Sequence, residues 1–154
     1  MDVAKILSEP GFFSGLDGPA IGVLASAATV RDLDRDEVLV RHEEPATSFY
    51  LVCDGEISRE VPSLRGPPLV MHSLGPGQVL GWAWLIPPRK WVFVGRARQP
   101  TRVIQFDGTR ILQRCESEPR FGYELMKRFS CLMTDRLTQV RRNMMSTWNP
   151  PGFG

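Results

Sequence analysis

The chain has few of the residues from which metal centres and disulfide frameworks are built. Only two histidines, His42 and His72, occur in 154 residues, thirty positions apart. The three cysteines, Cys53, Cys115 and Cys131, are odd in number and form no Cys-x-x-Cys pair. Metal sites need several converging nitrogen, oxygen or sulfur ligands, so neither a cupin-type metal site nor a zinc ribbon is expected. We interpret the cysteines as free thiols in a reducing compartment.

Long apolar runs, leader segments and catalytic signatures are also missing. No stretch approaches the roughly 18 consecutive apolar residues of a transmembrane helix, and the N-terminus has no signal-peptide pattern. No P-loop, dinucleotide fingerprint or nucleophile elbow occurs in the sequence. We therefore expect a cytoplasmic, non-enzymatic protein that holds no metal and does not associate with a membrane.

Charge is unevenly distributed along the chain, although the formal net charge is only +2. Residues 1–80 carry 6 basic and 12 acidic side chains, whereas residues 81–154 carry 13 basic and 5 acidic ones. Such asymmetry is typical of an anion-binding surface, or of two faces that attract one another within a fold or across a symmetric dimer. The basic residues are scattered rather than clustered, which favours two mutually attracting faces over an anion-binding surface.

The middle of the chain alternates apolar and polar residues over short segments that are separated by turns. Val38 and Val40 alternate with charged Glu37 and Arg41, and Phe49, Leu51 and Cys53 recur at every second position. Asp54-Gly55 is a hairpin signal, and Thr101–Phe106 is the last clear strand. Short strands at this spacing, without helices between them, predict a β-sandwich or barrel. The fold expected is mainly β: an eight-stranded jelly roll in a single domain, with N-terminal helices and a long C-terminal helix.

Helical spacing appears at both ends of the chain. Val3–Ser8 is followed by the breaker Pro10-Gly11, and Asp17 is placed to cap a second helix. A short helix is expected over Asp107–Arg114, with a long helix beginning near Pro119. The expected divisions are a helical segment (1–28), the jelly roll (29–107), C-terminal hinge and dimer helices (108–146) and a tail (147–154).

The long helix carries one apolar stripe in steps of three and four residues. Its members are Met126, Phe129, Met133, Leu137, Val140 and Met144. A helix with a single apolar stripe either packs on its own β-domain or pairs with a second copy of the chain. The stripe keeps a heptad register, which favours a homodimer through this helix.

Four ordered motifs resemble the cyclic-nucleotide-binding domain of the catabolite-activator and fumarate-nitrate-regulator superfamily. They are an opening Pro-Gly-Phe-Phe-Ser-Gly-Leu segment, a central hairpin, the lead into the phosphate-binding cassette and the strand that leaves it: Pro10–Leu16, Phe49–Ile57, Leu74–Gly81 and Pro100–Val103. The resemblance implies a jelly roll whose pocket repositions a hinge and a long helix, and so controls a partner protein or a dimer.

The two residues that grip the ligand in the family are replaced here. In the family, a glutamate follows the glycine that matches Gly81 and binds the ribose 2′-hydroxyl, whereas this chain has Trp82. The family's arginine, which pairs with the cyclic phosphate, falls on Trp91, and the small residues after it fall on Val92 and Phe93. A glycine–aspartate turn of the family is likewise replaced by Glu43-Glu44.

These replacements disfavour cyclic nucleotide as a ligand. Two lost charge-assisted hydrogen bonds correspond to about 3–6 kcal/mol, or on the order of 100- to 10,000-fold in affinity. Three arrangements remain open: tryptophans that fill the cavity, an aromatic box for another flat ligand, or a relocated phosphate clamp made by Arg89 and Lys90. The candidate pocket residues are Gly81, Trp82, Ala83, Trp84, Arg89, Lys90, Trp91, Val92 and Phe93.

The function predicted from the sequence is a stand-alone, non-catalytic regulatory sensor or adaptor domain with a protein partner. The alternatives are a structural protein–protein interaction module with a self-filled pocket, and a nucleotide sensor that uses the relocated clamp. Only about ten residues follow Met144, too few for a helix-turn-helix reader, so nucleic acid is not an expected partner.

Overall fold

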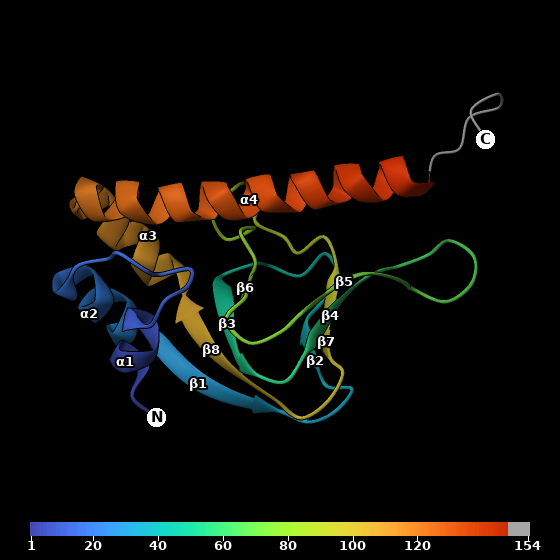
Figure 1. Ribbon diagram of the computed structural model, residues 1–154, viewed down its shortest axis with the longest axis horizontal. Coiled ribbons are helices and arrows are strands. Elements are labelled where there is room, and N and C mark those ends of the chain that lie inside the picture. Colours follow the sequence, from blue (N-terminus) through green and yellow to red (C-terminus); the bar gives the residue numbers. More distant parts are fainter. Residues whose placement is uncertain (148–154) are drawn as a thin grey trace.

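The computed structural model describes residues 1–147. It contains eight strands in two antiparallel sheets, with two helices before the strands in the chain and two after them (Figure 1). Of the expected tail (147–154), Thr147 is the last residue of the final helix, and residues 148–154 lie outside the described residues. In chain order, the elements are α1 (Val3–Ser8), α2 (Gly18–Ser26), β1 (Ala28–Leu33), β2 (Val38–Val40), β3 (Ser48–Asp54), β4 (Ile57–Val61), β5 (Leu69–Leu74), β6 (Val79–Leu80), β7 (Val94–Ala97), β8 (Thr101–Asp107), α3 (Gly108–Ser117) and α4 (Pro119–Thr147).

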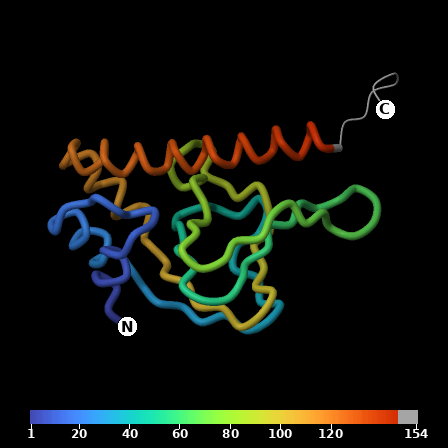
Figure 2. Tube along the Cα trace, viewed as in Figure 1, coloured from blue at the N-terminus to red at the C-terminus, as the bar shows by residue number. Residues whose placement is uncertain are grey.

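The strands form one sheet in the order β1-β8-β3-β6 and another in the order β2-β7-β4-β5. Strands that are far apart in sequence are therefore neighbours: β8 pairs with both β1 and β3, and β7 pairs with both β2 and β4. This arrangement confirms the expected mainly β fold of eight strands with N-terminal helices and a long C-terminal helix. The trace in Figure 2 shows α1, α2 and α3 gathered at one end of the β-domain.

Aspartates begin three of the helices, as their side chains accept hydrogen bonds from backbone amides of the first turn. Asp17 accepts from the Ala20 amide at 2.9 Å, and Asp107 accepts from the Arg110 amide at 3.2 Å. Asp2 does the same for α1. These caps satisfy N–H groups that have no partner inside the helix. The starts of α2 and α3 thus follow from local sequence.

The first sheet separates two hydrophobic cores because its side chains point alternately to opposite faces. Phe49 and Leu51 of β3 pack with the helices in one core, whereas Tyr50 and Val52 of the same strand pack between the two sheets in the other. The helices therefore cover a β-sandwich that already has its own core. Among residues 1–147, no helix combines the length and the apolar character needed to span a lipid bilayer.

The apolar stripe of α4 is divided between two environments. Phe129 is 1% exposed and makes edge-on ring contacts with Phe12, Phe49 and Trp84, at centroid distances of 5.0, 5.1 and 5.2 Å. Phe129 thus belongs to the core of its own chain, which differs from its expected place on a dimer face. Farther along α4, Leu137 is 50% exposed. Figure 1 shows the helix running along the whole β-domain.

The division of the stripe predicts unequal costs for truncating its members. Phe129→Ala should lower the free energy of unfolding by about 3–5 kcal/mol, because a buried ring leaves a cavity. Leu137→Ala should change the stability of the monomer by less than about 0.5 kcal/mol, because the side chain is half exposed. Urea denaturation at low protein concentration measures both. Equal costs for the two variants would contradict the division.

Candidate functional site

The loop between β6 and β7 carries three tryptophans, and each of them lies in a different environment. Trp84 is 1% exposed and enters the core beneath the helices, where its ring stacks on Phe49 at 4.9 Å. Its indole Nε1 donates a hydrogen bond to the Gly81 carbonyl at 3.2 Å. Trp91 enters the other core, between the sheets, whereas Trp82 stays half-buried. The loop therefore contributes to both cores at once.

The ring of Trp91 lies directly against the backbone of Gly81. Gly81 has a φ of +101°, and a Cβ atom at this position would lie 2.5 Å from Cη2 of Trp91. Such a contact is shorter than any real Cβ contact, so the indole needs a glycine here. Trp91 itself is 4% exposed and packs beside Tyr50 and Phe93 at centroid distances of 6.3 and 5.7 Å.

A second segment of the chain holds Trp91 in place through the backbone. The Trp91 carbonyl accepts from the Glu43 amide at 2.8 Å, and the Trp91 amide donates to the Glu44 carbonyl at 3.0 Å. The Ala46 amide donates to the Arg89 carbonyl at 2.8 Å. Glu43 has a φ of 71°, a left-handed conformation that favours glycine. The family has a glycine at this turn, and glycine suits a left-handed backbone. This chain keeps the left-handed backbone at Glu43, although the side chain there is a glutamate.

Little space remains beside Trp91. The cavity has a volume of about 40 Å³. A site for an ordinary small-molecule ligand occupies roughly 300 Å³ or more, so this cavity has room for water or a small group. Its walls come from β4, β6, the β6–β7 loop and α4: Arg59, Val79, Leu80, Gly81, Trp82, Ala83, Trp91, Val92, Phe93 and Arg136.

Most of the pocket residues expected from the sequence meet at this cavity. Six of the nine line it: Gly81, Trp82, Ala83, Trp91, Val92 and Phe93. Trp84 belongs to the core beneath the helices instead. Arg89 and Lys90 are exposed and are absent from the cavity wall, and Lys90 forms a β-bridge with Pro45.

Two arginines in the wall were not among the expected site residues. Arg59 lies on β4 and Arg136 on α4, so only the folded chain brings them together. No signal in the sequence marks either arginine: the neighbours of Arg59, Ser58 and Glu60, are polar, and their burial appears only in the folded chain. The Arg59 guanidinium lies 5.6 Å from the centre of the Phe93 ring.

The charges at this site are unfavourable to one another. Burial lowers the pKa of Arg59 to about 10, and repulsion from Arg136 contributes to the shift. Burial also lowers the pKa of Arg136, which the neighbouring Asp135 partly offsets. The pKa of His72 is lowered by burial and by both arginines, and its Nδ1 lies 2.8 Å from Nε2 of Gln139 on α4. Each shift disfavours positive charge at this place.

The comparisons with known proteins identify a family and a fold. A family model described as "Cyclic nucleotide-binding domain" matches residues 30–118. A putative cyclic nucleotide-binding protein from Geobacter metallireducens is 21% identical, with a TM-score of 0.78 over 89% of this chain and 98% of that one. A cyclic nucleotide-binding domain from Methylobacillus flagellatus is 18% identical, with a TM-score of 0.80 over 97% and 84%.

A regulator has the same fold. The sensor domain of the transcriptional regulator DNR from Pseudomonas aeruginosa is 16% identical, with a TM-score of 0.69 over 96% of this chain and 99% of that one. At these identities, the likeness establishes the fold but does not identify a ligand. Among curated proteins, none matches the chain. In the part of the chain that the structure describes, no three His, Cys, Asp or Glu side chains are grouped to hold a metal ion.

The contact between Gly81 and Trp91 predicts a specific coupling. Gly81→Ala should cost about 2–4 kcal/mol of unfolding free energy, because it combines an unfavourable φ with a steric clash. Gly77→Ala is the matched control, since Gly77 also has a positive φ of +86° but has no neighbouring atom within 4 Å of the added Cβ. Gly77→Ala should therefore cost only the backbone part, about 1 kcal/mol.

A double-mutant cycle isolates the clash. In a Trp91→Ala background, Gly81→Ala should cost about 1–3 kcal/mol less than in the wild type, because the ring is no longer there to be displaced. Urea denaturation of the four proteins gives the coupling free energy. Strictly additive costs would contradict the contact.

Proposed function

The chain belongs to the family of cyclic nucleotide-binding domains, and we propose that it is a non-catalytic regulatory sensor or adaptor domain that does not bind cyclic AMP or cyclic GMP in the usual way. The observation that carries this proposal is the Trp91 indole, which packs against Gly81 beside a cavity of about 40 Å³. The resemblance places the phosphate-binding arginine of relatives at Trp91. The side chain that gripped a phosphate is thus replaced by one that fills its space.

Both energy and volume disfavour nucleotide binding at this pocket. The missing glutamate and arginine remove about 3–6 kcal/mol of charge-assisted hydrogen bonding. In addition, Trp91 would have to leave a core where it is 4% exposed, which carries a cost comparable to truncating it, about 3–5 kcal/mol. The two penalties act together, because a nucleotide needs the ring to move before it can bind.

The helix α4 is the element that would transmit the state of the pocket. Arg136 of α4 lines the cavity, and Phe129 anchors the same helix in the core that Trp84 enters. A small displacement of the β6–β7 loop would therefore act on α4 at two places. One is Phe129, which packs against Trp84, and the other is Arg136, which lines the cavity. We propose that the position of α4 is the output of the domain, read by a protein partner or by a second copy.

A self-filled pocket also supports the second candidate function, a structural interaction module that needs no ligand. The small volume of the cavity favours it. The relocated clamp of Arg89 and Lys90 has less support, because both side chains are exposed and lie away from the cavity wall.

We further propose that two copies of the chain pair through the exposed part of α4. Leu137 is 50% exposed and Val140 is 42% exposed, and Met144 continues the stripe at 65%. A two-fold axis would place the same residues of two helices against each other and bury them. Arg141 and Arg142 flank this surface and are exposed, so their mutual repulsion makes the affinity of the dimer depend on salt.

Isothermal titration with cyclic AMP and cyclic GMP tests the pocket. The dissociation constant should be on the order of millimolar or weaker, because the two anchors are absent and Trp91 must be displaced. A dissociation constant below about 10 μM would contradict the proposal. In that event, loss of binding in the Arg89→Gln/Lys90→Gln variant would identify the relocated clamp.

Sedimentation velocity tests the dimer. The wild type should sediment as a dimer and Leu137→Glu as a folded monomer, because a charge at an exposed apolar position disrupts pairing without disturbing the core. Arg142→Gln is the matched control, since it changes the net charge by the same amount on the same helix and should remain dimeric. One oligomeric state shared by all three proteins would mean that this face is not the interface.

A further inference from the structure

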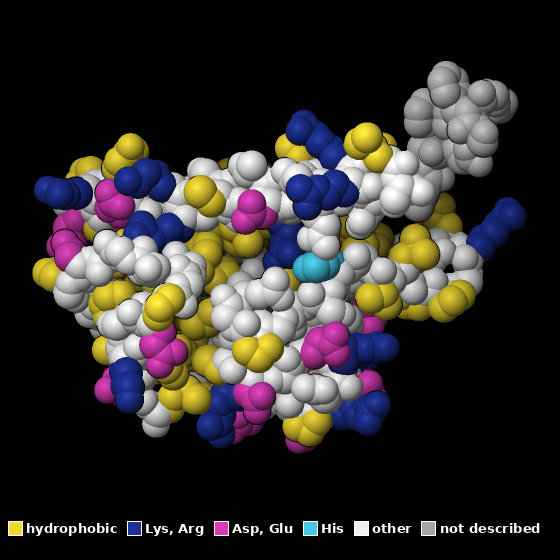
Figure 3. Space-filling view, in the orientation of Figure 1, with side chains coloured by type: hydrophobic (Ala, Val, Ile, Leu, Met, Phe, Trp, Pro, Cys, Tyr) yellow, Lys and Arg dark blue, Asp and Glu magenta, His cyan; other side chains and the backbone are white. Residues whose placement is uncertain are grey.

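The cavity beneath α4 brings together two cationic side chains from opposite walls. Arg59 enters it from β4 and Arg136 from α4, and aromatic rings of Trp82, Trp91 and Phe93 line the rest. The space-filling view in Figure 3 shows a histidine and Lys or Arg side chains in the hollow between the long helix and the β-domain. The lining is therefore mostly apolar, and it also contains two positive charges that repel one another.

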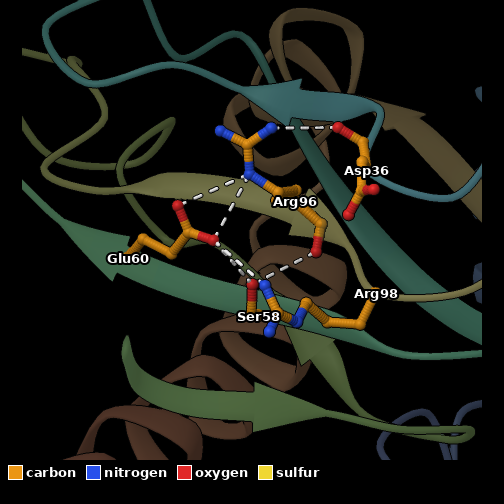
Figure 4. A network of polar contacts seen from close by, with 5 residues as sticks. All are labelled: Asp36, Ser58, Glu60, Arg96 and Arg98. Carbon is orange, nitrogen blue, oxygen red and sulfur yellow. Dashed lines mark hydrogen bonds and ion pairs between the residues drawn. The ribbon is translucent and has the colours of Figure 1, made fainter. Parts of the chain in front are cut away.

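Neither arginine has the carboxylate partner that a partly buried guanidinium normally has. Glu60 follows Arg59 in the chain, but its carboxylate lies 3.3 Å from Arg96 Nε and 3.7 Å from Arg98. Figure 4 draws these contacts as dashed lines. Glu60 is thus committed to another pair of arginines. Within residues 1–147, neither Arg59 nor Arg136 forms an ion pair.

One polar atom in this cluster is left without a partner. The Nε of Arg59 is buried and forms no hydrogen bond, and it is the only such side-chain atom in the described part of the chain. A buried donor without an acceptor costs roughly 1–3 kcal/mol, and more when it is charged. Native structures seldom retain such a group unless a ligand or water completes it. An acceptor with negative charge would satisfy the donor and separate the two like charges at once.

We propose that this cavity is an anion-binding site, in which one oxyanion group of a small ligand bridges Arg59 and Arg136. Guanidinium groups bind carboxylate and phosphate through paired N–H donors, and such charge-assisted bonds are among the strongest in proteins. The volume of about 40 Å³ limits the ligand to a small anion, or to the anionic end of a longer molecule that enters beside exposed Val92. The chemical class is a phosphate- or carboxylate-bearing ligand.

The inference deepens the proposed function and rests on it, since it names the ligand class of the same pocket. Bound anion would tie α4 to β4 through the two arginines, replacing their repulsion with attraction to a shared partner. The contact between His72 of β5 and Gln139 of α4 lies at the same seam between helix and sheet. The anion thus acts on the helix that we propose as the output.

Titration with inorganic phosphate and with acetate, against chloride at constant ionic strength, tests the site. Saturable binding of phosphate or acetate by the wild type is expected, at least tenfold weaker in Arg59→Gln and in Arg136→Gln. The relative affinities of the two probes distinguish a phosphate ligand from a carboxylate ligand. Arg142→Gln should bind as the wild type does, because this exposed arginine is on the same helix and outside the cavity.

A second measurement does not depend on the probe. Arg59→Met should raise the urea midpoint in anion-poor buffer, because an apolar side chain replaces an unpartnered charge. No saturable binding beyond the chloride control, or equal weakening in Arg142→Gln, would overturn the anion site. A lowered urea midpoint in Arg59→Met would also count against it.

Hydrogen exchange separates this inference from the proposed function. Phosphate or acetate at saturation should slow amide exchange in the second half of α4 in the wild type and leave Arg136→Gln unchanged. Binding that needs both arginines but leaves α4 exchange unaltered would support the anion site and refute the helix as its output.

Discussion

The packing of one indole ring against one glycine determines what this pocket can do. The indole ring of Trp91 occupies the space beside Gly81, and hydrogen bonds with the backbone of Glu43 and Glu44 fix the backbone of Trp91. Because the ring is part of the core between the sheets, it cannot leave without exposing a large apolar surface. The scaffold of a ligand-binding domain is therefore retained, while its interior is occupied by the chain itself.

The division of α4 follows from the same arrangement. Its first half is fixed by Phe129 in the core beneath the helices, and its second half passes over the cavity with Arg136 inward and Leu137 outward. In the proposed function, the inner face of the helix senses what the cavity holds, and the outer face pairs with a second chain. A change in charge inside the pocket and a change in assembly outside it would be linked through one rigid element.

Features that depend on local sequence could be predicted, and those that depend on tertiary pairing could not. The aspartate caps at Asp17 and Asp107 are set within a few residues, so helix starts were foreseeable. The motif order identified the family, and with it the loop that lines the cavity. The meeting of Arg59 with Arg136 depends on how α4 crosses the second sheet, and no local pattern encodes it. Phe129 illustrates the same limit, because a heptad register is equally consistent with packing on the chain's own core.

A proton NMR experiment on the contact between Trp91 and Gly81 tests directly whether the indole ring fills the pocket. We expect a nuclear Overhauser effect between the Hη2 proton of Trp91 and the Hα protons of Gly81, unchanged when cyclic AMP is added to millimolar concentration. An absent effect, or one that disappears as the nucleotide binds, would contradict it, since the ring would then be a movable gate over an open pocket.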